Sequence, residues 1–135
     1  LFSSNSASLS KTTTVYTAPS SANAVPTNTL EVSQSQTDGG ASNSGYTAGG
    51  AALTASADPV LSGDTACVKF NDVSFTSATF TARGCLIYNS TAVTGFTTNR
   101  AVCAVNFGAD KTVTSGTFTV QFPAQTAGNA IVQIA

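Results

Sequence analysis

The stretch "GTFTVQF", residues Gly116 to Phe122, alternates apolar and polar side chains with a period of two. Phe118, Val120 and Phe122 fall on one face of an extended chain, and the residues between them fall on the other. This alternation is typical of an antiparallel strand with one face buried and one face in water. A helix would scatter the same apolar residues around its circumference, so the stretch predicts β structure.

The same period recurs through the second half of the chain, in "ACVKF", "TFTARGCLIY", "NRAVCAVNF" and "AIVQIA". We therefore predict strands near residues 66–70, 80–88, 99–107, 116–122 and 130–134. Turn-forming residues separate them, notably "LSGD", "FGADKTVTSG" and "PAQTAGN". Short strands at this spacing predict an all-β fold, an antiparallel β-sandwich of jelly-roll or immunoglobulin-like type.

The alternation also assigns one face of each strand to the core. The predicted inner face of the 80–88 strand carries Phe80, Ala82, Gly84, Leu86 and Tyr88, with Thr81, Arg83 and Cys85 opposite. The inner face of the 99–107 strand carries Ala101, Cys103, Val105 and Phe107. The side chains predicted to form the core are Val68, Phe70, Phe80, Leu86, Tyr88, Val105, Phe107, Phe118, Val120 and Phe122, with Val132 and Ile134 closing the chain.

The composition supports the same fold class. The chain holds 17 serines and 22 threonines among 135 residues, and methionine is absent. Threonine favours strands, serine and glycine favour turns, and the good helix formers are scarce. Five basic and six acidic residues give a net charge of -1, which offers no electrostatic footprint for nucleic acid or an anionic membrane.

Apolar side chains are unevenly divided along the chain. Residues 1–58 hold ten bulky apolar residues, and residues 59–135 hold 25. We predict an extended N-terminal arm or edge segment at residues 1–44, ordered by contact with neighbouring subunits, and a β-sandwich domain at residues 45–135. "TTTVYT" and "TLEV" are candidate strands within the arm. Because the first residue is Leu, we do not expect Leu1 to be the translated start.

The Gly-rich stretch "GYTAGGAALT", residues 45–54, raises the alternative of a phosphate-binding loop. Such a loop needs a strand before its glycines, a helix after them and usually a lysine at its end. Here a polar segment precedes the glycines, no helical pattern follows, and no lysine lies near Gly49 or Gly50. We therefore interpret the stretch as a turn before an extended segment.

Residues with catalytic or metal-binding chemistry are few. The chain has no histidine, and its acids are Glu31, Asp38, Asp58, Asp64, Asp72 and Asp110, most of them in turn contexts. Cys67, Cys85 and Cys103 form no CxxC pair, and we predict free thiols, with Cys103 inward and the other two on the opposite sheet face. No catalytic, cofactor-binding or metal-ligating residue is predicted, although a hydrolytic acid pair and a three-thiol metal site remain alternatives.

Four segments in this order resemble small structural proteins of tailed bacteriophages: "SGYTAGGAALT", "VSFTSATFTARGCLIYN", "RAVCAVNFGADKTVTSGTFTVQFPA" and "AIVQIA". The resemblance covers residues 44–135. The chain departs from the family at Phe75, where the family often carries Trp, and in its three cysteines.

The resemblance implies a non-enzymatic virion component. The expected function is that of a capsid decoration or cement protein, assembled in the host bacterial cytoplasm and bound to the major capsid protein or other virion subunits. A homo-oligomer is expected, with a trimer as one candidate, without nucleic acid, membrane or cofactor. The alternatives are a tail, fibre or adhesion module, and a carbohydrate-binding β-sandwich, which would need exposed aromatic side chains among Tyr16, Tyr46 and Tyr88.

Overall fold

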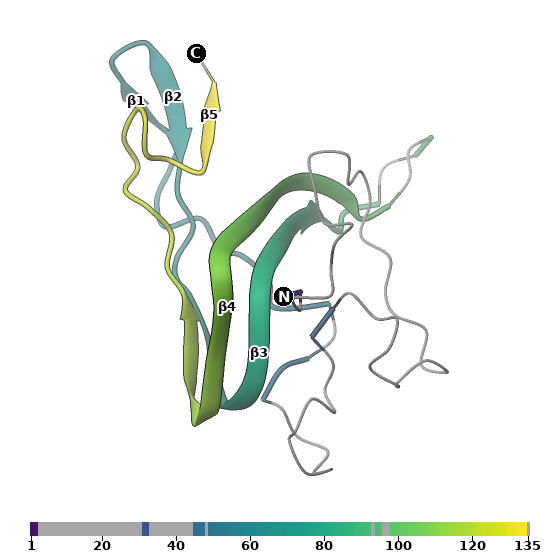
Figure 1. Ribbon diagram of the computed structural model, residues 1–135. Helices are drawn as coiled ribbons and strands as arrows, with labels where there is room; N and C mark the ends of the chain where they lie inside the picture. Colours follow the sequence, from purple (N-terminus) through teal and green to yellow (C-terminus); the bar gives the residue numbers. More distant parts are fainter. Residues whose placement is uncertain (3–30, 33–44, 48, 93, 96–97, 135) are drawn as a thin grey trace. The chain divides into compact units, whose positions relative to one another are not determined.

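The computed structural model describes residues 1–2, 31–32, 45–47, 49–92, 94–95 and 98–134 (Figure 1). Within these residues the chain is β-rich and contains no helix, so the predicted all-β class is confirmed. The strands are β1 (Val60–Ser62), β2 (Thr65–Val68), β3 (Val73–Asn89), β4 (Arg100–Val120) and β5 (Val132–Ile134). A helix long and apolar enough to cross a membrane is likewise absent from the described part.

The chain divides into two compact units. One, the hairpin unit, comprises Leu1–Gly50 and Thr76–Gly116, and the other, the small-sheet unit, comprises Ala51–Phe75 and Thr117–Ala135. β3 begins in the small-sheet unit and continues into the hairpin unit, and β4 begins in the hairpin unit and ends in the small-sheet unit. The predicted boundary between an arm at residues 1–44 and a domain at 45–135 stays a prediction.

The small-sheet unit contains a three-stranded antiparallel sheet in the order β1-β2-β5. Leu61 pairs with Ala66, and Ala66 pairs with Ile134, so these three side chains lie in one row on the same face. Cys67, one residue along β2, points to the opposite face and is fully buried. β1 was not predicted, because "LSGD" was interpreted only as a turn; Gly63, at φ +64°, makes that turn directly after β1.

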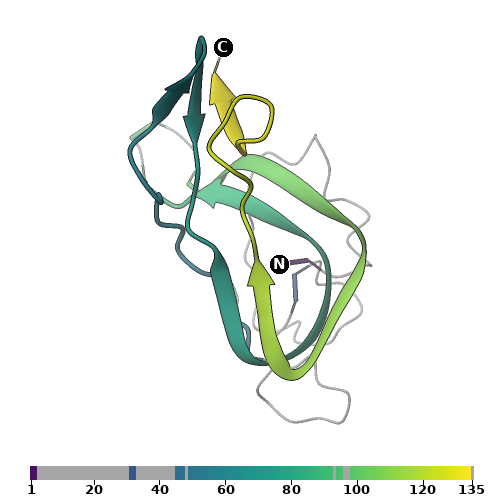
Figure 2. The same cartoon turned by 90° about the vertical axis from the view of Figure 1, so that its left-hand side faces the viewer.

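The hairpin unit is built on the pairing of β3 with β4, which run side by side in both views (Figure 2). The sequence predicted two strands, 99–107 and 116–122, separated by a turn in "FGADKTVTSG". That prediction is wrong, because β4 continues through the whole segment. Positive φ angles at Gly108 and Ser115 absorb the turn-forming residues as local irregularities within one strand.

The predicted alternation is correct at the end of β4 and shifts within β3. Phe118, Val120 and Phe122 are buried or half-buried, and the polar residues between them are exposed. In β3 the alternation holds up to Gly84, but Cys85 and Ile87 are then buried. The prediction that Cys85 faces away from the core is therefore wrong. Two consecutive buried residues at 84 and 85 move the core face by one position.

The core contains fewer large side chains than predicted. Of the predicted core residues, only Phe80 and Phe122 are buried, and the others are half-buried. The buried apolar set is completed by Leu1, Phe2, Val32, Tyr46, Cys67, Ala78, Ala82, Cys85, Ile87 and Ala130. Ile134, predicted to close the chain inward, is 71% exposed instead. In the small-sheet unit Phe70 and Phe122 pack edge to face, with ring centroids 5.7 Å apart.

Of the predicted arm, only Leu1, Phe2, Glu31 and Val32 belong to the described residues, and all four are buried. Phe2 forms antiparallel bridges both to Glu31 and to Gly84 of β3. We expected Leu1 and Phe2 to be covered by a neighbouring subunit, whereas in this structure their own chain covers them. The candidate strand "TTTVYT" lies outside the described residues.

Candidate functional site

Buried polar groups gather where "GYTAGG" meets Glu31. The side chain of Glu31 is 3% exposed. Its Oε1 accepts a hydrogen bond from the Tyr46 hydroxyl at 2.6 Å and a second from the Gly49 backbone N–H at 2.7 Å. Two donors on one oxygen hold the carboxylate in a single position and replace the water that it has lost.

The glycines of this loop allow the backbone a conformation and an approach that other residues disfavour. Gly45 has φ +69°, and a Cβ atom at this position would lie 2.6 Å from the Thr76 carbonyl oxygen. Gly49 and Gly50 also have positive φ, at +91° and +81°. Because this conformation is cheap only for glycine, "GYTAGG" forms a turn that carries the Gly49 N–H to Glu31.

Two tyrosines fasten the loop to β3. The Tyr46 ring packs edge to face against Phe80, with ring centroids 5.9 Å apart. The Tyr88 hydroxyl donates a hydrogen bond to the Gly49 carbonyl oxygen at 2.8 Å. Tyr46 therefore contributes both ring packing and a bonded hydroxyl, the usual behaviour of buried tyrosine, and Tyr88 contributes a hydroxyl bond to the loop backbone.

Leu1 and Phe2 lie between Glu31–Val32 and β3, and isolated β-bridges join Phe2 to Glu31 and to Gly84. On one side the Val32 N–H donates to the Leu1 carbonyl oxygen at 2.9 Å. On the other, the Phe2 N–H donates to the Gly84 carbonyl oxygen at 2.9 Å, and the Arg83 N–H donates to the Phe2 carbonyl oxygen at 2.7 Å. Backbone hydrogen bonds therefore hold these two residues on both sides.

The α-amino group of Leu1 completes the cluster. It donates to the Tyr46 hydroxyl at 2.7 Å, and that hydroxyl in turn donates to Glu31. Burial lowers the pKa of this amine below its ordinary value of 8.0, while the nearby Glu31 carboxylate opposes the shift. Burial also raises the pKa of Tyr88, and Glu31 adds to that shift. We call the region between Glu31–Val32 and Arg83–Gly84, which Leu1 and Phe2 fill and Tyr46 bounds at one end, the Glu31 slot.

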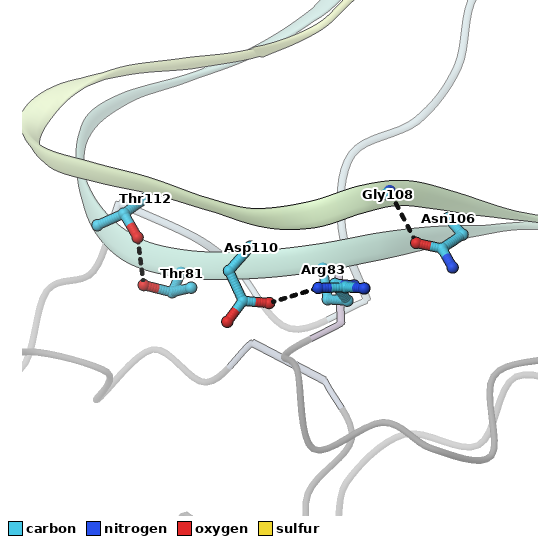
Figure 3. A network of polar contacts seen from close by, with 6 residues as sticks. All are labelled: Thr81, Arg83, Asn106, Gly108, Asp110 and Thr112. Atoms are coloured by element: carbon cyan, nitrogen blue, oxygen red, sulfur yellow. Dashed lines mark hydrogen bonds and ion pairs between the residues drawn. The ribbon is translucent and has the colours of Figure 1, made fainter.

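A second group of polar contacts lies on the exposed surface of the β3–β4 hairpin (Figure 3). Arg83 and Asp110 form an ion pair at 3.6 Å, with both side chains more than two-fifths exposed. Thr81 and Thr112 share a hydrogen bond at 2.9 Å, and Asn106 Oδ1 accepts the Gly108 N–H at 2.8 Å. The first two contacts join β3 to β4 and the third lies within β4. All of them are exposed to water, where each adds little to stability.

Four of the other predicted acids belong to the described residues. Asp72 accepts the Phe122 N–H at 3.0 Å, Asp110 pairs with Arg83, and Asp58 and Asp64 are exposed. Asp38 lies outside the described residues. Within the part of the chain that the structure describes, Glu31 therefore has tyrosine, backbone and amine neighbours rather than the second carboxylate that a hydrolytic pair requires.

The three cysteines are free thiols in the structure. Cys67 and Cys85 are buried and Cys103 is half-buried, so the predicted placement of Cys67 and Cys85 on an outer face is wrong. Burial raises the pKa of Cys85 to about 11 and also raises that of Cys103. The described residues contain no cluster of three cysteine or acidic side chains able to hold a metal ion.

Sequence reasoning did not identify Glu31 as the centre of a site. The acid stands alone between Leu30 and Val32, and a single charge in an apolar run is a signal for a buried, paired group. Its partners could not be named from that signal, because Tyr46 and Gly49 lie 15 and 18 residues farther along the chain.

Comparisons with known proteins give no relative for this chain. Neither the models of known protein families, nor the curated proteins, nor the solved structures contain a match.

Proposed function

We propose that the protein is a non-enzymatic structural component of a tailed-bacteriophage virion, a decoration or cement protein of the capsid. The proposal is supported by the resemblance of residues 44–135 to such proteins and by the β-rich structure with five basic and six acidic residues. It includes the antiparallel sandwich arrangement, with residues 1–44 as an arm.

The observation that carries the proposal is an exposed apolar surface on the small sheet. One face of β1-β2-β5, here called the Leu61 face, presents Leu61, Ala66, Val68, Val132 and Ile134. Leu61 is 76% exposed and Ile134 is 71% exposed. No charged side chain belongs to this face. Moving its apolar side chains out of water and into contact with a partner protein is therefore favourable.

Burial of the Leu61 face by a partner would stabilise the contact substantially. Complete burial of one Leu or Ile side chain is worth about 1.5–3 kcal/mol. A small face of this kind makes a modest contact by itself, and many copies on one shell add their contacts together. We therefore propose the major capsid protein or another virion subunit as the partner, with copies of this chain joined as a homo-oligomer on the virion, without nucleic acid or membrane.

A tail, fibre or adhesion module is the second candidate, because an exposed apolar sheet face serves any of these assemblies. A carbohydrate-binding sandwich has weaker support. Tyr46 is 3% exposed and Tyr88 is half-buried with its hydroxyl bonded to Gly49, so neither offers an open aromatic platform for a sugar ring.

The copy number on purified particles tests the proposal. A decoration protein is expected in numbers comparable to those of the major capsid protein, as measured by quantitative mass spectrometry of intact virions. A far lower copy number would favour the tail or fibre module. Absence of the protein from washed particles would overturn the proposed virion function in both forms.

A further inference from the structure

The outer edge of β4 is open over a run of seven residues. β3 pairs with one edge of β4, and among the residues that the structure describes no strand pairs with the other edge (Figure 1). Residues 101–107, "AVCAVNF", alternate regularly along this edge between half-buried and exposed side chains. Every second residue of such an edge directs its backbone N–H and C=O groups away from the sheet, where another strand can bond them. We call this run the 101–107 edge.

The 101–107 edge lacks the features by which β proteins usually block the addition of a strand. Charged side chains, proline and local irregularities discourage pairing at an edge. The run contains no charged residue, no proline and no glycine. Farther along β4, Gly108 and Ser115 have positive φ angles, and Asp110 and Lys111 carry charges. The unprotected part of β4 is therefore confined to this run.

Apolar side chains of the run are incompletely covered. The inner row is half-buried rather than buried, and it consists of Ala101, Cys103, Val105 and Phe107. On the outer row Val102 is 54% exposed. A strand laid along this edge would therefore cover apolar surface on both faces in addition to bonding the backbone.

We propose that the 101–107 edge joins two copies of this chain, through antiparallel pairing of β4 with β4 about a two-fold axis at Ala104. Ala104 then lies opposite Ala104 of the second copy. On the inner row Phe107 faces Ala101 and Val105 faces Cys103, so the largest side chain meets the smallest. The two-fold axis makes each of these pairs occur twice. This inference rests on the proposed homo-oligomer, for which it names the contact.

Charges at the two ends of the run favour a second copy as the occupant. Arg100 directly precedes the run, Asp110 follows it, and both side chains are exposed. Antiparallel pairing about Ala104 places Arg100 of one copy diagonal to Asp110 of the other, and the symmetry repeats this contact between opposite charges. Lys111 belongs to the opposite face by alternation and does not oppose it. A parallel pairing in register would instead set Arg100 against Arg100.

A charge exchange at Ala104 tests the two-fold axis in the full-length chain. Ala104 is exposed, so Ala104→Lys and Ala104→Glu are expected to fold, as their thermal transitions verify. Each variant alone sets like charges opposite each other, and we expect sedimentation equilibrium to show a dimer Kd raised about fivefold or more. An equimolar mixture of the two is expected to restore the dimer, because opposite charges then meet. Thr114→Lys and Thr114→Glu are the matched controls, exposed on β4 beyond the run, and are expected to leave the Kd unchanged.

Disulfide trapping covers the case in which a charge at position 104 prevents folding. Val102 lies opposite Asn106 of the second copy in the proposed register. In a Cys103→Ala chain, Val102→Cys and Asn106→Cys are therefore expected to form a linked dimer when mixed under mild oxidation, and neither variant is expected to link alone.

Either measurement can overturn the edge pairing. An oligomer that the variants at positions 104 and 114 retain equally, or cysteine variants that link alone as readily as when mixed, would contradict it and leave the proposed homo-oligomer intact. A chain that stays monomeric at all concentrations would overturn both the pairing and the homo-oligomer. Particle binding is measured separately by co-sedimentation, so a failure of the virion function is distinguishable from a failure of the pairing.

Discussion

Glu31 is 3% exposed and Leu61 is 76% exposed, so two regions of one small chain reverse the usual placement of polar and apolar groups. In the Glu31 slot, each buried polar group has a partner within the chain. On the Leu61 face, apolar side chains remain in water. A buried charge that accepts hydrogen bonds from its own chain stabilises the fold, whereas an uncovered apolar face is suited to contact with another molecule.

The largest expected loss of stability comes from adding a side chain at Gly84. In Gly84→Ala the new methyl group meets the Val105 carbonyl oxygen at 2.5 Å, and backbone atoms on both strands must move. We expect a loss of about 3 kcal/mol or more in the free energy of unfolding. Gly116→Ala is the matched control in the same hairpin, because its nearest contact is the Val113 side chain at 3.2 Å. Chemical denaturation gives both values, and equal losses would contradict the packing described at Gly84.

Removal of the Glu31 carboxylate is expected to cause the next largest loss of stability. Glu31→Ala leaves the Tyr46 hydroxyl and the Gly49 N–H without their acceptor, and we expect a loss of about 2–4 kcal/mol. Glu31→Gln keeps an acceptor oxygen in place and is expected to lose less. Asp110→Ala removes an exposed ion pair with Arg83 and is expected to change stability by about 1 kcal/mol or less. If the denaturation midpoints of the Ala variants at 31 and 110 coincide, the slot contributes no more than the surface.

Prediction from sequence succeeded where the signal is local and failed where distant partners decide. The alternation of Phe118, Val120 and Phe122 is local in sequence, and the structure preserves it although β4 ends at Val120. The turn-forming residues after Phe107 led to the wrong prediction of a turn, because β4 accommodates them with positive φ angles at Gly108 and Ser115. The burial of Glu31 depends on donors from a loop and a tyrosine far along the chain, and the alternation in β3 shifts where Phe2 bridges Gly84.

The pH dependence of stability tests the charge in the slot. Because burial lowers the pKa of the Leu1 amine, the unfolded chain binds this proton more tightly than the folded chain. Stability is therefore expected to rise with pH from the lowered pKa towards 8.0 and to level off above it. Cys85 acts oppositely: its pKa is raised to about 11, so stability falls as pH rises above its ordinary value of 9.0.

Denaturation midpoints are measured from pH values below 8.0 to just above it. In this range the effect of the Leu1 amine on stability is separated from that of the Cys85 thiol, which begins above pH 9.0. The control is the same chain with an acetylated N-terminus, which cannot carry the charge. We expect the upward slope in the native chain and its loss after acetylation. An identical slope in both chains would assign the pH dependence to another group.

The smallest effect is a difference in thiol accessibility. Cys67 and Cys85 are buried, and Cys103 is half-buried on β4. In the folded protein we expect alkylation at Cys103 first, with modification of the other two only after unfolding. Peptide mapping by mass spectrometry after a timed reaction gives the order, and early modification of Cys85 would contradict its burial in the folded protein.

The most direct test of the central claim compares particle binding by variants of the two exposed apolar regions. Leu61→Thr with Ile134→Thr replaces the two most exposed apolar side chains of the Leu61 face and leaves β propensity high. Val102→Thr is the matched control, because Val102 is 54% exposed on β4 and lies outside that face. Folding of each variant is first verified by its thermal transition, and binding to particles that lack the protein is then measured by co-sedimentation. The proposed attachment predicts a loss of binding for the double variant and unchanged binding for Val102→Thr; unchanged binding for both would contradict it.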